Sequence, residues 1–131
     1  MTSVSQPRIS LIVRTMGHEA LSRAIESVRA QTWPSKEIIL VVANPAFEAT
    51  SWMEQPDIVI VAPGVALDRP RAANAGLAKA TGEWLQFLDE DDWIDPGHVE
   101  TLWKAAVAAP NILLAYSDML IHKKDQPFVR S

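Results

Sequence analysis

The sequence predicts an α/β domain in which helices cover both faces of a mostly parallel sheet. Segments typical of strands alternate with segments typical of helices along most of the chain. Two strand segments, residues 37–43 and 58–62, are apolar without the polar alternation of a half-exposed strand, which indicates burial on both faces. Four acidic residues directly follow another such segment, residues 84–88, at the point where sheets of this class bind their ligands.

The first third of the chain predicts a strand, a helix and a second strand. Residues 9–13 form a short β-branched run. Residues 18–30 predict a helix, because their apolar side chains recur at spacings of three and four residues: Leu21, Ala24, Ile25 and Val28. The second strand, residues 37–43, ends at Asn44-Pro45, which is a turn signal.

The middle of the chain continues this alternation. The third strand, residues 58–62, stops at Pro63-Gly64. Residues 71–81 are rich in alanine and predict a helix, which we expect Gly82 to terminate. Residues 84–88 then predict the fourth strand, and the acidic cluster lies at its carboxyl end.

The last part of the chain predicts one more helix and one more strand. Asp95 and Pro96 are typical of a helix N-cap and of the first helical position. Residues 112–116 predict a fifth strand, and we expect residues 119–131 to form a polar, frayed tail or a truncated connection. Residues 1–131 are therefore expected to be one domain, with its core in residues 8–118.

Composition limits the function classes. Apolar residues make up 48% of the 131 residues and charged residues 21%, as in a folded globular protein. The net charge of −4 argues against a nucleic-acid partner, because such partners usually require a surplus of basic side chains. The absence of cysteine excludes disulfides, thiolate catalysis and zinc–sulfur sites. No segment is typical of a signal peptide or a transmembrane helix, so we expect a cytoplasmic protein.

The acidic cluster at residues 89–92, Asp-Glu-Asp-Asp, is the main candidate for a functional site. Such a run often only solvates a loop, and it would also suit the start of the following helix. However, Asp95 is already available as the N-cap, and the cluster begins where the sheet emerges from the core. Several carboxylates at one point repel one another unless a divalent cation neutralises them. Oxygen ligands without cysteine or a histidine cluster favour Mg²⁺ or Mn²⁺ over zinc.

Four segments of the chain are similar to motifs of one enzyme family. They are the opening strand with Arg14-Thr15, Ser-Val-Arg-Ala-Gln-Thr at residues 27–32, Arg-Ala-Ala-Asn-Ala-Gly at residues 71–76 followed by Ala-Thr-Gly-Glu at residues 80–83, and Phe-Leu-Asp-Glu-Asp-Asp-Trp at residues 87–93. In this order they resemble the N-terminal half of a family 2 glycosyltransferase. The resemblance implies a truncated GT-A fold, which is a Rossmann-like three-layer sandwich. It also implies inverting transfer of a sugar from a nucleotide-diphosphate sugar to an acceptor hydroxyl.

The resemblance also implies roles for individual residues. Asp91 would ligate a Mn²⁺ or Mg²⁺ ion that bridges the donor diphosphate, and Asp89 would contact the same metal or the ribose of the donor. Thr15 would contact the nucleoside from the first loop, and Arg71 or Asn74 would approach the nucleotide. The implied partners are a nucleotide-diphosphate sugar donor and a glycan, lipid or protein acceptor, in the biosynthesis of polysaccharides.

The chain departs from the family pattern in two places. Where the family commonly has an acidic pair after the second strand, this chain has Asn44, which would hydrogen-bond a base edge through an amide. The arginine expected directly before Asn74 is Ala73, with arginines at positions 69 and 71 instead. In the family, the acceptor site and the catalytic base follow the fifth strand, so no general base is assigned here. An exposed apolar edge where that second half would dock is expected to promote a homodimer.

Two other functions fit parts of the same pattern. The first is a nucleotide-binding module of the same fold without catalysis, which Asn44 favours and which would show weak metal-dependent binding or none. The second is a sugar nucleotidyltransferase, although the loop at residues 14–18 lacks the glycine-rich basic sequence of that class. The sequence contains no G-x-G-x-x-G motif, which argues against a dinucleotide-binding oxidoreductase. It has no acidic pair after the first strand, which argues against a response-regulator receiver.

Overall fold

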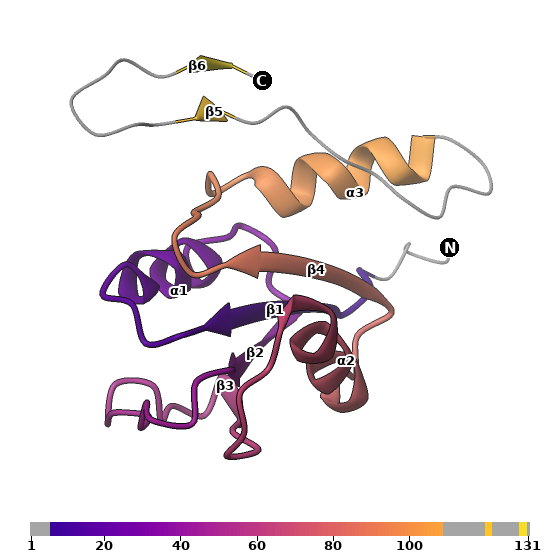
Figure 1. Cartoon of the computed structure of the whole chain (residues 1–131). Helices are drawn as coiled ribbons and strands as arrows, with labels where there is room; N and C mark the ends of the chain where they lie inside the picture. The colour runs from indigo at the N-terminus through magenta and orange to yellow at the C-terminus, as the bar shows by residue number, and fades with distance from the viewer. Residues whose placement is uncertain (1–5, 109–119, 122–128, 131) are drawn as a thin grey trace.

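The computed structural model describes residues 6–108 and two short strand segments, residues 120–121 and 129–130. Its main sheet has the strand order β3-β2-β1-β4 (Figure 1), and each neighbouring pair is parallel. The bounds of these strands are Ile9–Thr15 for β1, Lys36–Val42 for β2, Ile58–Val61 for β3 and Trp84–Asp89 for β4. Because the strands run in one direction, their carboxyl ends lie at the same edge of the sheet.

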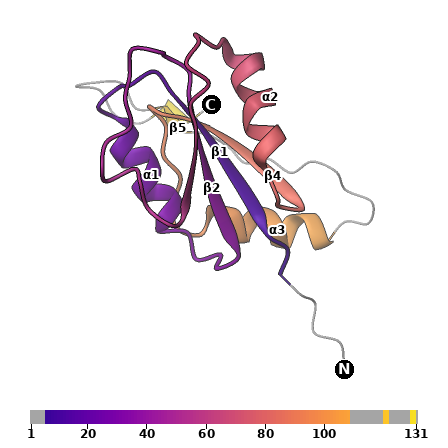
Figure 2. The ribbon, with the colours of Figure 1, turned by 90° about the horizontal axis from the view of Figure 1, so that it is seen from below.

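Helices on both faces of the sheet complete three layers. Their bounds are Leu21–Arg29 for α1, Arg69–Lys79 for α2 and His98–Ala108 for α3. Figure 2 shows α1 and α2 on opposite sides of β1 and β2. Val99 and Trp103 of α3 pack in the same apolar cluster as α1, whereas α2 packs on the other face of the sheet. This arrangement confirms the predicted α/β fold.

The strands form where the sequence predicts them, with differences at their ends. β1 and β4 continue further than expected, so that Thr15 and Asp89 belong to strands. The strand expected at residues 112–116 lies outside the described residues. β5, Leu120–Ile121, pairs antiparallel with β6, Val129–Arg130, inside the segment expected to be a frayed tail. No described helix is long and apolar enough to cross a membrane.

Burial explains why β1 and β2 lack polar alternation. Leu11 and Leu40 are fully buried in the cluster that contains α1 and α3. Ile12 of β1 and Ile39 of β2 are buried in the cluster beneath α2. Each central strand is thus covered on both faces, as the apolar runs predict.

β4 is covered on only one face in the described part of the chain. Leu88 is buried on the side of α1, but Leu85 and Phe87 are 43% and 51% exposed on the other side. They are exposed because α2 packs mainly over β1, β2 and β3. Leu85 and Phe87 form an exposed apolar patch on β4, the edge strand of the main sheet. Dimerisation through an apolar edge stays a prediction.

The start of α2 differs from the sequence prediction. The helix begins at Arg69 rather than at residue 71. Asp68 is its N-cap, because the Asp68 carboxylate accepts a hydrogen bond of 2.9 Å from the Arg71 backbone N–H. Pro70 suits the first turn of a helix, where a missing N–H costs nothing.

Gly82 does not terminate α2, contrary to the prediction. The helix ends at Lys79, and the C-cap residue Ala80 is extended. A Cβ at Gly82 would lie 2.6 Å from the Ser10 backbone nitrogen, which is closer than real contacts allow. Glycine is therefore needed here for the close approach of the α2–β4 connection to β1.

The N-terminus of α3 is capped by Gln31, which follows α1 in the chain, rather than by Asp95. The helix begins at His98, whose backbone N–H donates to the Asp95 carbonyl in a turn. The Gln31 side chain accepts from the Val99 N–H at 3.0 Å and donates to the Asp95 carbonyl at 2.6 Å. The expectation that the Asp95 side chain is the N-cap is wrong, because this turn delays the helix and Gln31 supplies the acceptor.

A buried carboxylate lies at the amino end of the sheet, away from the acidic cluster. Glu37 of β2 is 6% exposed and lies 3.4 Å from Arg8. It accepts hydrogen bonds from the Ser10 hydroxyl at 2.6 Å and from the Thr81 backbone and hydroxyl at 2.7 and 2.8 Å. Burial opposes ionisation, but the hydrogen bonds from Ser10, Thr81 and Arg8 outweigh it and lower the pKa of Glu37 from 4.5 to about 2.

We expect Glu37→Gln to destabilise the chain by about 2 kcal/mol at neutral pH, because hydrogen bonds to a charged acceptor are stronger than those to a neutral one. The folded-state pKa lies below the unfolded value. The extra stability is therefore complete above about pH 4.5 and is lost as the pH falls toward 2. Urea unfolding of both proteins across this range measures the effect. A difference that does not shrink at low pH would contradict this explanation.

Candidate functional site

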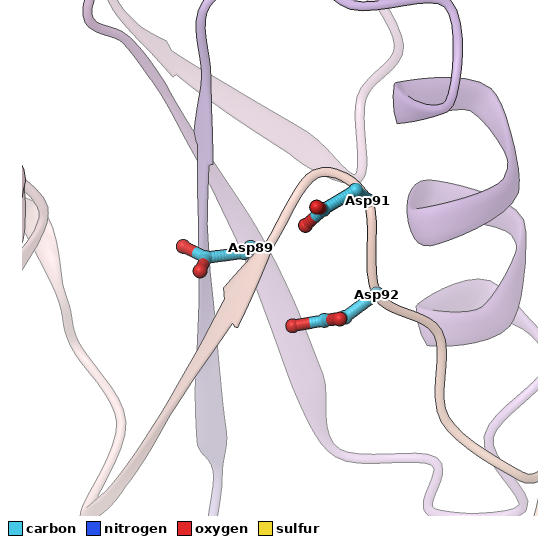
Figure 3. A group of neighbouring side chains, drawn as sticks. All are labelled: Asp89, Asp91 and Asp92. Atoms are coloured by element: carbon cyan, nitrogen blue, oxygen red, sulfur yellow. The ribbon is translucent and has the colours of Figure 1, made fainter. Parts of the chain in front are cut away.

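Three of the four acidic side chains lie together at the carboxyl edge of the sheet. Asp89 is the last residue of β4, and Asp91 and Asp92 follow it in the next loop. Figure 3 shows the three side chains on the same side of this loop. One carboxylate oxygen from each lies within 4.8 Å of the other two. Asp91 and Asp92 are exposed, and the Asp89 side chain is 42% exposed.

This oxygen cluster fits a hard divalent cation. Mg²⁺ takes oxygen ligands at about 2.0–2.1 Å, which places opposite ligands roughly 4 Å apart, so small side-chain rotations would suffice. Desolvation by neighbouring protein atoms and the charges of Asp91 and Asp89 raise the pKa of Asp92, while Arg69 opposes this shift. The carboxylates thus repel one another, and a cation between them would relieve the repulsion. The structure brings together the predicted pair Asp89 and Asp91 and adds Asp92.

The fourth acid, Glu90, is buried and engaged elsewhere. Its carboxylate accepts hydrogen bonds from the Thr15 hydroxyl at 2.9 Å, the Met16 backbone N–H at 2.7 Å and the His18 backbone N–H at 2.8 Å. The interpretation that the whole acidic run serves one cation is therefore wrong for Glu90. This side chain binds the loop between β1 and α1 instead.

The two residues expected near the nucleoside are both engaged within the protein. Thr15 is fully buried, and its hydroxyl donates to Glu90 and accepts from the Gly17 backbone N–H at 2.9 Å. Asn44 is partly exposed, and its amide nitrogen donates to the Met16 carbonyl at 3.1 Å. Its amide oxygen accepts from the backbone two residues further on at 3.0 Å. Both side chains shape the loops at this edge, and a nucleoside contact by either stays a prediction.

Two cavities lie beside the acidic cluster. They share Arg14, Arg69 and Asp89 in their walls, and their volumes are about 320 and 370 Å³. The first is otherwise lined by Ile12, Ala73, Phe87, Leu88 and Asp92, and the second by Met16, Gly17, His18, Glu90 and Asp91. Volumes of this size are typical of sites for small ligands.

Two arginines give these cavities positive charge. The Arg69 guanidinium lies 3.6 Å from an Asp89 carboxylate oxygen, and its side chain is 76% exposed. Arg14 lies directly opposite Asp89 in the pairing of β1 with β4. Its guanidinium donates to the Leu67 carbonyl at 3.2 Å, and its Nε has no hydrogen-bond partner among the described residues. Guanidinium groups placed in this way are suited to bind phosphate oxygens.

Arg71 and Asn74, to which the resemblance gives a role, lie elsewhere on α2. Both are exposed, and neither is among the residues that line the two cavities. Arg69 precedes Ala73 by one helical turn and shares the wall of the first cavity with it. An approach of Arg71 or Asn74 to the nucleotide stays a prediction, and Arg69 is the residue of α2 that reaches the acids.

No role was predicted for Arg14 or Arg69, and Asp92 was predicted only as part of the acidic run. Asp68 followed by Pro70 is a readable signal for a helix start, and it would have placed Arg69 in the first turn of α2. Asp92 lies in a loop, where strand periodicity does not indicate the direction of a side chain.

The far side of the acidic loop is attached to α1. The Arg23 guanidinium lies 4.1 Å from the centre of the Trp93 ring, which is a cation–π geometry. Gln31 holds the Asp95 carbonyl of the same loop. These contacts fix the loop after Asp92, and Glu90 fixes it before Asp91 by its hydrogen bonds to the β1–α1 loop.

Comparison with known proteins identifies the family. Residues 10–121 match the family described as glycosyl transferase family 2. The succinoglycan biosynthesis protein ExoO of Rhizobium meliloti (strain 1021) is 33% identical over 113 residues, which cover 79% of this chain and 31% of ExoO. The chain spans about a third of the length of the curated relatives it matches.

Solved structures with the same fold support this match. The mannosyltransferase PcManGT of Pyrobaculum calidifontis, in complex with GDP-Man and Mn²⁺, has a TM-score of 0.68 and 22% identity over 83% of this chain and 34% of its own. S. aureus TarS 1-349, in complex with UDP-GlcNAc, has a TM-score of 0.58 and 23% identity over 76% of this chain and 30% of its own. The family match covers most of the sequence and the fold agrees with it, so the chain belongs to glycosyl transferase family 2.

Proposed function

We propose that the chain forms the donor-binding part of a glycosyltransferase that moves a sugar from a nucleotide-diphosphate sugar to an acceptor hydroxyl, with inversion and with Mn²⁺ or Mg²⁺. The observation that carries this proposal is the convergence of Asp89, Asp91 and Asp92 with Arg69 and Arg14 at the carboxyl edge of the sheet. In this proposal a cation site and an anion site would lie side by side, as a metal-bound diphosphate requires. Membership of the family supports the reaction class.

In this proposal Asp91 and Asp89 hold the cation, and Asp92 supplies a third oxygen. When bound, the cation would stabilise the negative charge that develops on the departing diphosphate as the glycosyl C1–O bond breaks. The chain contributes the fixed positions of the carboxylates. Asp89 is held in β4 by its pairing with β1, and Glu90 attaches the next residue of the loop to the β1–α1 loop.

Arg69 and Arg14 would bind oxygens of the diphosphate. The three negative charges of the aspartates exceed the two positive charges of one cation. With only the cation bound, the cluster would therefore still repel a diphosphate. The two guanidinium groups reverse this balance, and Arg69 lies at the N-terminus of α2, where the helix dipole adds positive charge. The exposed ion pair between Arg69 and Asp89 contributes little stability. Arg69 can therefore move from Asp89 to a phosphate at low cost once a cation neutralises Asp89.

We infer that the donor nucleotide is UDP or GDP, because PcManGT was solved with GDP-Man and TarS with UDP-GlcNAc. Asn44 would then meet the base with an amide instead of a carboxylate. The name of ExoO supports a polysaccharide as acceptor. We assign the acceptor site and the general base to parts of the whole protein outside the described residues. A base must lie within hydrogen-bond reach of the acceptor hydroxyl.

A nucleotide-binding module without catalysis is the second candidate. The observation that favours it is the state of Asn44, whose amide nitrogen and oxygen are both hydrogen-bonded within the protein. In such a module the aspartates would only solvate the loop. Nucleotide binding would then be weak or independent of metal.

Calorimetric titration of the chain with UDP, GDP, ADP and dTDP, with and without Mn²⁺, tests the proposal. We expect one or two of the four nucleotides to bind, and only in the presence of Mn²⁺, because the aspartates repel a diphosphate until a cation neutralises them. Binding that is equally strong without the metal would favour the non-catalytic module. Failure of all four to bind a folded chain would refute the donor site.

A further inference from the structure

Glu90 is the one member of the acidic run at residues 89–92 that has no role in the proposed function. Its residue is 9% exposed, and its carboxylate is surrounded by three donors at 2.7–2.9 Å. Two of these donors are the backbone N–H groups of Met16 and His18, and the third is the Thr15 hydroxyl. A carboxylate buried to this extent needs such partners, and the N–H groups need the carboxylate in turn.

The register of the sheet explains why Glu90 meets this loop. Arg14 of β1 is paired with Asp89, the last residue of β4, so Thr15 ends β1 beside the point where Glu90 begins the turn after β4. Thr15 turns to the face of the sheet opposite Arg14, because side chains alternate along a strand. The Glu90 side chain lies on this side as well, where it accepts from the Thr15 hydroxyl and reaches the loop that leads to α1.

The loop that Glu90 holds forms part of a cavity wall. Met16, Gly17 and His18 line the cavity of about 370 Å³ together with Asp89 and Asp91. A diphosphate bound beside these aspartates would direct the rest of its nucleotide along this wall. The shape of the loop therefore determines whether a nucleotide fits, whereas the aspartates determine whether a cation binds.

The loop has anchors on two sides. The Asn44 amide holds the Met16 carbonyl from the β2 side. Gly17 has a φ of +90°, and a Cβ there would lie 2.9 Å from the Phe47 ring, so the β2–β3 connection packs closely against it. On the β4 side the anchor is Glu90. Removing it leaves two backbone N–H groups without their acceptor while the contacts from the β2 side persist.

We propose that Glu90 is a positioning residue that holds residues 16–18 in the shape that receives the donor nucleotide, without ligating the metal. This inference rests on the proposed function, because it assumes that a metal-bound nucleotide occupies the cavity. It adds that adjacent positions of the acidic run have separate tasks. Asp89 and Asp91 bind the cation, and Glu90 between them shapes the wall that the nucleotide contacts.

The test separates cation binding from nucleotide binding. In Glu90→Gln, one carboxylate oxygen becomes an amide N–H₂ group, which cannot accept a hydrogen bond. Calorimetry should give a Kd for Mn²⁺ alone within about twofold of the wild-type value, and a Kd for UDP or GDP at saturating Mn²⁺ about tenfold higher. A tenfold increase is expected if residues 16–18 adopt the binding-competent conformation about a tenth of the time. Thr15→Val removes one of the three donors to Glu90, together with the acceptor of the Gly17 N–H, and should give a smaller change of the same kind.

Glu54→Gln is the matched control, since Glu54 is an exposed glutamate away from the site and should change neither Kd. Hydrogen exchange at the Met16 and His18 amides should accelerate in Glu90→Gln, because their acceptor is weakened. If Glu90→Gln fails to fold, Thr15→Val decides by the same comparison, because it keeps the carboxylate and two of its donors.

If the wild-type chain binds Mn²⁺ and nucleotide, two results would overturn the role of Glu90 and leave the proposed function intact. Equal loss of Mn²⁺ and nucleotide affinity would make Glu90 a metal ligand, and unchanged affinity for both in a folded variant would make it a stability element only. A wild-type chain that binds neither Mn²⁺ nor any of the nucleotides would instead refute the proposed function, and this inference with it.

Discussion

Replacing Asp91 with alanine is expected to weaken nucleotide binding in the presence of Mn²⁺ by about 100-fold or more. Changes to residues that only support a metal ligand typically cost 10–100-fold in metal affinity, and loss of a ligand should reach at least the upper end of about that range. Asp91 is exposed and one of its oxygens lies within 4.8 Å of oxygens of Asp89 and Asp92. Calorimetry with UDP or GDP, at several Mn²⁺ concentrations, measures the effect. The fold should be unchanged, because no described contact of the core involves Asp91.

Asp95→Ala is the control for Asp91→Ala. Asp95 is also exposed and lies four positions further along the same loop, but it takes part in the described hydrogen bonds through its backbone carbonyl. We expect this variant to bind nucleotide and Mn²⁺ as the wild type does. Equal losses in the two variants would mean that general negative charge attracts the cation, and that no defined ligand set exists.

Arg69→Ala is expected to weaken binding of a nucleoside diphosphate by about 10- to 100-fold. A hydrogen bond to a charged group contributes about 1.5–3 kcal/mol, and each 1.4 kcal/mol corresponds to about a tenfold change in affinity. Arg69 lies 3.6 Å from Asp89 and lines both cavities, so it can reach a phosphate held next to the cation. Titration with UDP, UMP and uridine, or with the corresponding guanosine series, in the presence of Mn²⁺ measures the loss of affinity. It gives this loss for ligands with two, one and no phosphates.

The loss should grow with the number of phosphates, because Arg69 is proposed to contact the diphosphate and not the nucleoside. Arg71→Ala is the matched control, since Arg71 is an exposed arginine two positions along the same helix that lines neither cavity. It should leave all three affinities within about twofold. A larger effect from Arg71 than from Arg69 would restore the role that the resemblance gives to Arg71.

The layers of the fold could be predicted because buried faces leave a pattern of apolar residues in the sequence. β1 and β2 are apolar without alternation since helices cover both of their faces, and the stripe of α1 buries Leu21, Ala24, Ile25 and Val28 as its spacing predicts. The helix termini were less predictable, because they depend on partners far away in the sequence. Gln31, in the connection after α1, caps α3, and no local pattern around Asp95 reveals it.

The site shows the same contrast. The position of the acidic run at the end of β4 could be predicted from the sequence. The separation of Glu90 from the three aspartates could not, because it depends on contacts with the end of the neighbouring strand β1. Strand alternation alone suggests that Glu90 shares a face with Leu88, and the donors that bind it belong to a loop more than 70 residues earlier. Arg69 depended in turn on where α2 begins.

A crystal structure of the chain with Mn²⁺ and a bound nucleoside diphosphate would test directly whether the aspartates hold a metal-bound diphosphate. The anomalous scattering of Mn²⁺ would locate the metal. We expect one Mn²⁺ ion bound by carboxylate oxygens of Asp89 and Asp91, with a diphosphate oxygen on the same ion and Arg69 moved from Asp89 to a phosphate. Anomalous density away from these aspartates, or a nucleotide bound while Arg69 still pairs with Asp89 and no metal is present, would contradict this expectation.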